Sequence, residues 1–187
     1  DTIEGDLSRR DFTVNSMALE LTTELPSFIA PFDGLGDLGK KILRTPHSAE
    51  QSFSDDPLRM MRAARFASQL NFTLDAEVVE AMNDMSGRIA IISAERVRDE
   101  FVKMLMSPNP RIGITILVDT GLAEHILPEI PKLRLEIDEH HHHKDVYEHS
   151  ITVLEQAITQ EDRLGGPNLV NRLAALLHDI GKPKTRA

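Results

Sequence analysis

Four charged residues in one segment have the types and the spacing to recognise a nucleotide base. Asp56, Arg59, Arg62 and Arg65 follow one another at intervals of three residues, so on a helix their side chains lie along one slowly drifting face. A carboxylate accepts a hydrogen bond from an amino group, whereas an arginine only donates and suits a ring nitrogen. Cytosine and adenine present these two groups side by side, while uracil and guanine reverse them and would leave a buried Asp–Arg pair unsatisfied. The Asp56–Arg59 pair therefore predicts selection of C and A, and the later arginines suit phosphate oxygens.

The same residues also fit a plain structural interpretation. Acidic residues at the N-terminus of a helix are stabilised by the helix dipole, and Asp55 and Asp56 precede a helix that Pro57 is suited to begin. The arginines that follow would then form an ordinary solvated face. Spacing alone does not decide between the two interpretations, so other parts of the sequence have to.

Four segments, in the family's order along the chain, resemble motifs of the class II family of CCA-adding tRNA nucleotidyltransferases and bacterial poly(A) polymerases. Residues 6–18, DLSRRDFTVNSMA, resemble its ribose-recognition motif, and residues 33–45, DGLGDLGKKILRT, resemble its flexible connecting motif. Residues 53–66, FSDDPLRMMRAARF, are similar to its base-reading motif, and residues 95–101, ERVRDEF, to its neck-helix motif. The resemblance covers roughly residues 1–130, and the ordered motifs make it highly specific.

The resemblance implies a role for each matching residue. Asp56 and Arg59 would pair with the incoming base, and Asp11 would hold the ribose hydroxyl. Three arginines would also contact the nucleotide: Arg10, Arg62 and Arg65. Glu95 and Arg98 of the neck-helix motif are expected to form a salt bridge that braces the fold. These roles favour the nucleotide-reading interpretation over the structural one.

The chemistry of the family needs groups that this sequence does not contain. Nucleotide transfer uses two Mg²⁺ ions, held by an Asp-x-Asp pair after a Gly-rich turn, which activate the attacking hydroxyl and stabilise the leaving pyrophosphate. No Asp-x-Asp occurs in the 187 residues, and the family carries this pair upstream of the ribose motif. We therefore expect a fragment that lacks the N-terminal catalytic part and adds no nucleotides by itself. No catalytic residue is assigned in it.

A second group of residues resembles the start of an HD domain, a helical metal-dependent phosphohydrolase module. His149 lies in KDVYEHS at 144–150, and His178 and Asp179 lie in LAALLHDIGKP at 173–183. The resemblance implies that these three side chains converge on a divalent transition metal, for which Mn, Fe, Ni and Zn suit imidazole and carboxylate ligands. The metal would activate a water molecule against a phosphoester. The family adds another Asp downstream, so this site is expected to be incomplete.

Helices must position most of these residues. Caps, prolines and apolar periodicity predict helices over about 7–18, 57–69, 75–85, 94–106, 111–119, 145–160 and 168–180. The loosely alternating segment 19–32 predicts an irregular hairpin, residues 33–37 have turn chemistry, and His140–His143 is interpreted as a solvated loop.

The expected fold class is mainly α, with a multi-helix neck. A small β remnant of the nucleotidyltransferase head precedes the neck, and the first helices of an HD domain follow it. The predicted domains are 1–45, the C-terminal end of the head; 46–130, the helical neck with the base-reading and RNA-binding region; and 131–187, the truncated start of the HD domain.

Composition limits the function further. The net charge is −9, from 21 Lys and Arg against 30 Asp and Glu, so nucleic acid must be bound through local clusters rather than overall charge. A composition of 41% hydrophobic and 27% charged residues excludes a disordered chain. No apolar run reaches the roughly 20 residues of a membrane span, so no membrane partner is expected. The absence of Cys excludes a disulfide framework and a Cys nucleophile, and favours a cytoplasmic location.

The leading hypothesis is a fragment of a tRNA nucleotidyltransferase that adds CCA to tRNA 3′ ends without a template. Its partners would be the tRNA 3′ end, CTP and ATP, and residues 15–19, NSMAL, favour this tRNA-directed branch. A bacterial poly(A) polymerase of the same family, using ATP alone, is one alternative. An HD-type phosphohydrolase with residues 1–110 as scaffold is another. The sequence leaves open the HD activity, its phosphoester and metal, and the oligomeric state.

Overall fold

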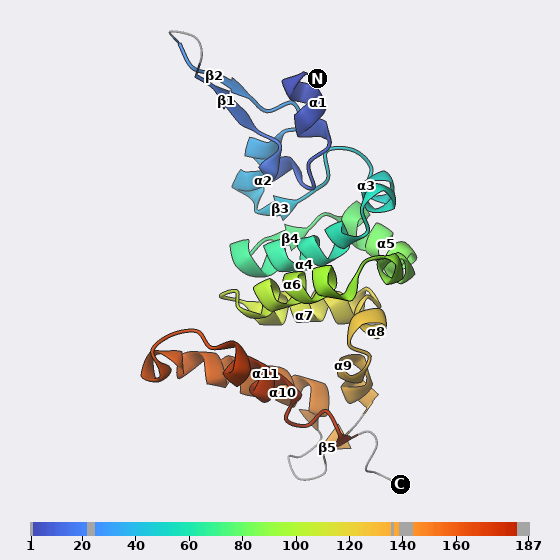
Figure 1. The fold of residues 1–187 in the computed structure, drawn as a ribbon, viewed down its shortest axis with the longest axis vertical. Coiled ribbons are helices and arrows are strands. Elements are labelled where there is room, and N and C mark those ends of the chain that lie inside the picture. Colours follow the sequence, from blue (N-terminus) through green and yellow to red (C-terminus); the bar gives the residue numbers. More distant parts are fainter. Residues whose placement is uncertain (1, 22–24, 136, 139–143, 183–187) are drawn as a thin grey trace.

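The computed structural model describes residues 2–21, 25–135, 137–138 and 144–182. The predicted loop His140–His143 lies outside these residues. Figure 1 shows an elongated molecule in which short helices are stacked along the long axis, from the N-terminal hairpin to a pair of C-terminal helices. The described residues contain three two-stranded sheets and are otherwise mostly helical. The predicted mainly α class, with a small β element near the N-terminus, is confirmed.

The N-terminal part differs in detail from the expected elements. The predicted helix over 7–18 is wrong, because α1 spans Ile3–Ser8 and is followed by the 3₁₀ turn η1 at Thr13–Asn15. Thr2 caps α1 by accepting a hydrogen bond from the backbone N–H of Gly5. Beyond Ser8 the chain becomes extended at Phe12, and the N–H of Thr13 donates to the carbonyl of Arg44. A long-range backbone contact thus replaces the expected helix.

The hairpin that follows is confirmed, whereas the next turn is not. Strand β1, Ala18–Glu20, pairs antiparallel with β2, Ser27–Ile29. Residues 33–37 belong mainly to α2, Gly34–Lys40, which starts after Asp33 in a left-handed conformation. Strand β3, Ile42–Leu43, then pairs in parallel with β4, Thr73–Leu74, and so ties the N-terminal part to the helices below it.

Gly34 packs too tightly to carry a side chain, and this gives a stability prediction. A Cβ at Gly34 would lie 2.2 Å from the carbonyl oxygen of Thr13, whereas Gly39 of the same helix has no neighbour within 4 Å. We expect Gly34→Ala to lower the free energy of unfolding by about 1–3 kcal/mol through overpacking. The matched control Gly39→Ala should leave it unchanged or raise it by up to about 1 kcal/mol. Urea unfolding measures both, and equal effects would contradict the packing argument.

A buried carboxylate in α2 should make the N-terminal part sensitive to acid. Asp37 is fully buried and accepts hydrogen bonds from Thr13 and Arg44. Burial raises the pKa of Asp37, but the hydrogen bonds from Arg44 and Thr13 outweigh it and hold the pKa below its ordinary value of 3.8. The lowered pKa stabilises the fold above the unfolded-state pKa, and this contribution is lost as pH falls through the folded-state pKa.

We therefore expect the free energy of unfolding to decrease as pH is lowered from about 5 towards 2. Asp37→Asn should reduce stability at pH 7 and make the decrease at low pH shallower, because the group no longer titrates. Urea unfolding across a pH series measures both effects. An unchanged pH dependence in Asp37→Asn would assign the acid sensitivity to other carboxylates.

The helical neck is built around α4, Leu58–Leu70, which confirms the helix predicted from Pro57 onward. Helix α4 buries Met60, Met61 and three alanines, and these small side chains let α6, Ala94–Leu105, and α7, Pro110–Asp119, pack closely against it. Helix α5, Ala76–Met85, is also close to its predicted range. Helix α3, Ala49–Asp55, was not predicted, although Ser48 caps it by accepting a hydrogen bond from the N–H of Gln51.

The C-terminal part is a helical hairpin below the neck (Figure 1). Short helices α8, Ala123–Ile126, and α9, Glu129–Lys132, lead to α10, Val146–Thr159. The 3₁₀ turn η5, Glu161–Leu164, then connects α10 to α11, Leu169–Leu177. Strands β5, Ile137–Asp138, and β6, Lys144–Asp145, pair antiparallel before α10. The predicted helices over 145–160 and 168–180 are confirmed, with α11 ending earlier than expected.

A buried ion pair joins this hairpin to the neck. Arg172 of α11 is 3% exposed and binds Glu161 through two hydrogen bonds of 2.6 and 2.7 Å. Its remaining terminal nitrogen donates to the carbonyls of Leu105 and Ser107, both at 2.7 Å. The hydrogen bond from Arg172 holds the pKa of Glu161 below its ordinary value. One side chain therefore connects α11, η5 and the end of α6.

Among the residues described, no helix combines the length and the apolar character that crossing a membrane requires.

Candidate functional site

A polar pocket of about 430 Å³ lies where the N-terminal segment meets the start of α4. It falls within the size range of small-molecule sites. All its lining residues carry hydrogen-bonding side chains, and its four arginines outnumber its two aspartates, which favours an anionic ligand rich in polar groups. The lining residues are Arg9, Arg10, Asp11, Asn15, Asp56, Arg59 and Arg62.

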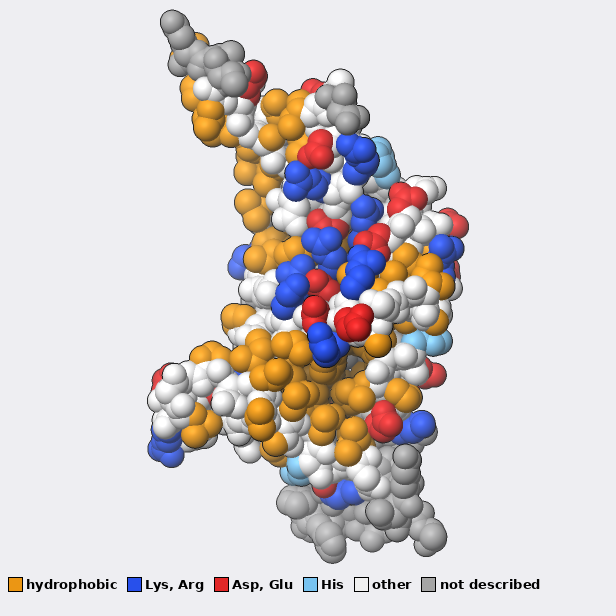
Figure 2. Space-filling model, in the orientation of Figure 1, with side chains coloured by type: hydrophobic (Ala, Val, Ile, Leu, Met, Phe, Trp, Pro, Cys, Tyr) orange, Lys and Arg blue, Asp and Glu red, His pale blue; other side chains and the backbone are white. Residues whose placement is uncertain are grey.

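The pocket contains five of the six residues predicted to bind a nucleotide. They come from three parts of the chain: the segment after α1, the junction between α3 and α4, and the first turns of α4. Figure 2 shows basic side chains, with acidic ones between them, gathered in a strip that runs down the upper half of one face, above an apolar area. The five residues are Arg10, Asp11, Asp56, Arg59 and Arg62.

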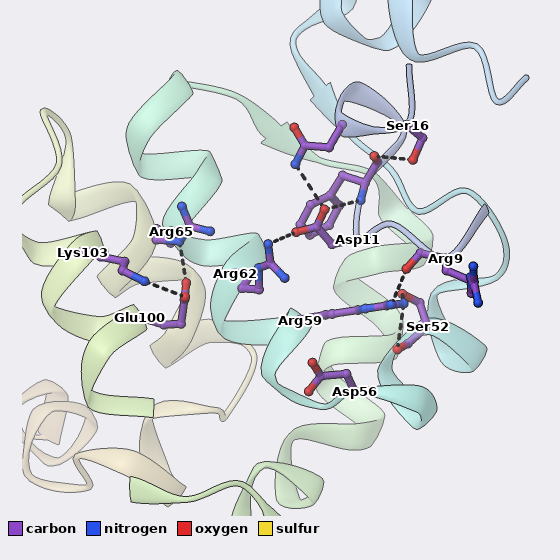
Figure 3. A network of polar contacts seen from close by, with 12 residues as sticks. Arg9, Asp11, Ser16, Ser52, Asp56, Arg59, Arg62, Arg65, Glu100 and Lys103 are labelled. Carbon is purple, nitrogen blue, oxygen red and sulfur yellow. Dashed lines mark hydrogen bonds and ion pairs between the residues drawn. The ribbon is translucent and has the colours of Figure 1, made fainter. Parts of the chain in front are cut away.

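Asp11 is the most buried charged residue of the pocket, at 5% exposure. One carboxylate oxygen accepts hydrogen bonds from the N–H of Phe12 and from the amide of Asn15, at 3.1 and 3.2 Å. The other lies 2.8 Å from a terminal nitrogen of Arg62, as Figure 3 shows. These contacts set the direction of the carboxylate: one oxygen already accepts two hydrogen bonds, and the other is buried against Arg62.

Arg59 reaches across to two groups outside its own helix. One terminal nitrogen donates to the hydroxyl of Ser52 at 2.8 Å, and the other donates to the carbonyl of Arg9 at 2.6 Å (Figure 3). Because the two acceptors bond the two different terminal nitrogens of Arg59, they hold its guanidinium in one plane. The described residues offer no partner to its Nε–H.

Asp56 lies at the C-terminal end of α3, one residue before Pro57. One oxygen accepts from the N–H of Leu58 at 3.1 Å, and the other lies 3.3 Å from Arg96 of α6. The structure brings the side chains of Asp56 and Arg59 to one pocket without a hydrogen bond between the carboxylate and the guanidinium. Both side chains therefore keep capacity to bind a third group.

Arg65 is not brought to the pocket. Its guanidinium bonds Glu100 of α6 and Gln69, and lies 3.9 Å from the ring centroid of Phe66. Its side chain is only 11% exposed. The prediction that Arg65 contacts the nucleotide thus has no support from the shape of the pocket, and its contacts are those of a side chain that joins α4 to α6.

The expected salt bridge between Glu95 and Arg98 is wrong. Arg98 instead pairs with the neighbouring Asp99 at 2.9 Å, and both side chains are exposed. In the same helix Arg96 binds Asp56, forty residues earlier in the chain. Arg96 and Ser52 were not among the predicted site residues, because nothing in the local sequence pattern indicates a contact between helices. Asn15 could have been found, since it lies four residues after Asp11 within the ribose motif.

The three predicted metal ligands lie together at the end of the C-terminal hairpin. Nε2 of His178 is 3.2 Å from Nε2 of His149 and 3.3 Å from a carboxylate oxygen of Asp179. That oxygen is 3.8 Å from Nε2 of His149. Ligand atoms bound to one metal at about 2.0–2.2 Å are roughly 3–3.5 Å apart, so the spacing fits a shared cation.

The tautomer of His178 also suits a metal. Its Nδ1 lies 2.9 Å from the carbonyl of Ala175, and a carbonyl accepts only from an N–H. In the neutral ring the proton is therefore on Nδ1, and Nε2 carries the lone pair that faces His149 and Asp179. Lys182 lies 2.7 Å from the same Asp179 oxygen, so a cation would share that oxygen with the ammonium group.

Three family models match the chain in succession. Residues 1–44 match the Poly A polymerase head domain, residues 71–133 match the probable RNA and SrmB-binding site of polymerase A, and residues 146–187 match the HD domain. These models define the class of protein: a polymerase-type nucleotidyltransferase head is followed by an RNA-binding helical region and an HD domain. Both the nucleotidyltransferase and the HD families generally use divalent metals.

Similar proteins give the family. The A-adding tRNA nucleotidyltransferase of Deinococcus radiodurans is 40% identical over 99% of this chain, and the CCA-adding enzyme of Lactobacillus johnsonii is 48% identical over 66% of it. The solved Bacillus stearothermophilus CCA-adding enzyme in complex with CTP is similar over 94% of the chain, with 31% identity and a TM-score of 0.67. The chain belongs to the family of tRNA nucleotidyltransferases and bacterial poly(A) polymerases, as the motifs predict.

The chain spans less than half the length of these proteins. It covers 42% of the Deinococcus enzyme, 30% of the Lactobacillus enzyme and 43% of the Bacillus structure. The predicted domain limits at 45 and 130 stay predictions.

Proposed function

We propose that this chain selects the incoming nucleotide and contacts tRNA in a template-independent tRNA nucleotidyltransferase, which adds CCA to tRNA 3′ ends from CTP and ATP. The main support is the polar pocket, which gathers five of the six residues predicted to bind a nucleotide. The names of the relatives, A-adding and CCA-adding, and the CTP in the Bacillus enzyme agree with this role. A cytoplasmic location is part of the proposal.

Each pocket residue has a chemical task in this proposal. The carboxylate of Asp56 accepts from the amino group of cytosine or adenine, and Arg59 donates to the neighbouring ring nitrogen. Asp11, held in place by Arg62, accepts from a ribose hydroxyl. Arg10, which is half exposed at the rim, suits phosphate oxygens. Arg65 has no task here, because Glu100 and Gln69 already occupy its guanidinium.

Mg²⁺ belongs to the proposal only for the whole enzyme. When bound, two such ions would activate the attacking hydroxyl and neutralise the leaving pyrophosphate. The pocket carboxylates do not fit this task, because Asp11 and Asp56 are each already paired with an arginine. No step of the reaction is therefore assigned to metal ligands in residues 1–187.

The test is the length of the products that the full-length gene product makes on two primers, a tRNA that lacks its 3′ CCA and a tRNA that ends in CC. We expect two additions with CTP alone, and one further addition when ATP is also supplied. Long tails from ATP alone would instead assign a poly(A) polymerase, and a single A added only to tRNA ending in CC would assign an A-adding enzyme like the Deinococcus relative. No extension by any nucleotide would overturn the proposal.

The His149, His178 and Asp179 cluster supports a second function. We infer that it holds a divalent transition metal and serves an HD-type phosphohydrolase activity. The support is the 3.2–3.8 Å spacing of the ligand atoms and the Nδ1–H of His178 donated to Ala175. A bound metal would supply an activated water for attack on a phosphoester. His178 orients its Nε2 lone pair for this metal.

Metal binding gives a direct prediction. The 187-residue protein, purified without chelator and then titrated with Mn²⁺ in a calorimeter, should bind the ion. His178→Ala should weaken the binding by at least about tenfold, because it removes a ligand whose direction is preset. His125→Ala, which changes an exposed histidine outside the cluster, should bind Mn²⁺ like the wild type. Equal affinity in the wild type and His178→Ala, or no binding by either, would contradict the assignment.

A further inference from the structure

The guanidinium of Arg59 forms part of the wall of two adjacent pockets. The first is the 430 Å³ pocket that contains Asp56. The second, of about 270 Å³, lies on the side of α3 and contains Ser52 but not Asp56. The group that bonds Arg59 at 2.8 Å therefore lies outside the pocket proposed for the base. Arg9, whose carbonyl is the other acceptor at 2.6 Å, lines both pockets.

The two acceptors use only part of the donor capacity of Arg59. A guanidinium has five N–H groups in one plane. One terminal nitrogen of Arg59 donates to the hydroxyl of Ser52 at 2.8 Å and, at 3.5 Å, to its carbonyl, and the other donates to the carbonyl of Arg9. Two bonds at different nitrogens define the plane as well as the position of the group. The Nε–H and the second hydrogen of the nitrogen that bonds Arg9 are left for a ligand, and their directions follow from the fixed plane.

Ser52 is well placed to set this plane. Ser52 lies in α3 and is only 5% exposed. Water therefore has little access to its hydroxyl and does not readily replace Arg59 as its hydrogen-bond partner. Ser52 and Arg59 are seven residues apart and belong to different helices, joined at Asp56 and Pro57. The hydroxyl therefore ties the direction of the Arg59 donors to the junction that carries Asp56.

The geometry points to Ser52 as a positioning residue for base selection. Its hydroxyl fixes the guanidinium plane of Arg59 from behind the base pocket, so that the free donors meet the ring nitrogen of a base whose amino group is bound by Asp56. This inference rests on the proposed nucleotide selection. Ser52 does not touch the nucleotide; its effect passes entirely through Arg59.

The experiment compares nucleotide choice in the full-length gene product with tRNA as primer. We expect Ser52→Ala to lower the ratio of kcat/KM for CTP over UTP roughly tenfold, the equivalent of one charge-assisted hydrogen bond. The kcat/KM for UTP should stay near the wild-type value, because the contacts to ribose and phosphates remain. Ser54→Ala, an exposed serine of the same helix, should keep the wild-type ratio.

A double-mutant cycle separates positioning from a structural role. In an Arg59→Ala background, Ser52→Ala should cause no further change in the CTP to UTP ratio. The inference is overturned if Ser52→Ala lowers the CTP to UTP ratio equally in the wild type and in Arg59→Ala. It is also overturned if Ser52→Ala lowers kcat/KM for CTP and for UTP by the same factor, or if that variant fails to fold. It is also overturned, with the proposed function intact, if the wild type discriminates and Ser52→Ala discriminates equally well. A wild type without discrimination overturns both.

Discussion

Replacement of Arg172 by alanine is expected to lower the free energy of unfolding by about 3–5 kcal/mol, the cost of breaking a buried ion pair on one side. The change would leave the carboxylate of Glu161, 6% exposed, without its partner. It would also take the donor away from the carbonyls of Leu105 and Ser107. Since unpaired buried charge is far more costly than a lost surface contact, this should exceed every surface substitution in the chain.

Urea unfolding of the 187-residue protein measures the effect. Arg163→Ala, which removes an exposed arginine of the neighbouring turn, is the matched control and should change stability by less than about 0.5 kcal/mol. The double variant Arg172→Met with Glu161→Met should recover most of the loss, because no buried charge is then left unpaired. A loss below about 1 kcal/mol in Arg172→Ala would show that the pair is not needed to hold α11.

The same substitution should also weaken metal binding. His178 follows α11 directly and His149 lies on α10, so their 3.2 Å separation depends on how the two helices are held. Releasing α11 from η5 and α6 should broaden that distance. Mn²⁺ titration of Arg172→Ala under conditions where it remains folded should show weaker binding than the wild type.

Asp56→Ala is expected to lower kcat/KM for CTP and ATP by about 100-fold, while UTP and GTP are affected less. The carboxylate is the acceptor for the amino group that distinguishes C and A, and a site built to pair with such a group discriminates strongly only while that partner is present. The selectivity, rather than binding in general, should therefore be lost. Primer extension of tRNA by the full-length gene product, with each nucleotide alone, measures it.

Two controls accompany this prediction. Glu50→Ala removes an exposed carboxylate of α3 and should leave nucleotide choice unchanged. Arg96→Ala removes the 3.3 Å ion pair to Asp56 but keeps the carboxylate, and exposed pairs of this kind contribute about 0–1 kcal/mol. It should therefore keep most of the selectivity. If Asp56→Ala still prefers C and A over U and G, the base-reading assignment is wrong.

Local signals in the sequence were enough for most of the neck. Pro57 lies directly before α4, and Pro110 is the first residue of α7. Proline favours the first position of a helix whatever the tertiary context, and both helices match their predicted ranges within a few residues. Local signals failed at α1. Ser8 has the chemistry of an N-cap, yet it ends the helix, because the chain after it is held by the bond between Thr13 and Arg44.

The arginines of α4 show where a sequence pattern stops being informative. Arg59, Arg62 and Arg65 are evenly spaced, but three residues fall about 60° short of a full helical turn. The side chains therefore rotate steadily around the helix. Arg59 and Arg62 face the pocket, whereas Arg65 has turned to Glu100 of α6. Even spacing could not reveal this, because it depends on which neighbour lies on each side.

By itself, the sequence determined the mainly α class and the family, and it predicted the residues that would carry the chemistry, because residue types, caps and motif spacing are local properties of the chain. Only the tertiary structure decided which of those residues share a pocket, and which side chains hold them. Ser52 and Arg9 on Arg59, Arg96 on Asp56, and Arg172 on Glu161 are contacts made between separate elements. They depend on how helices pack, and packing is set by the whole chain at once.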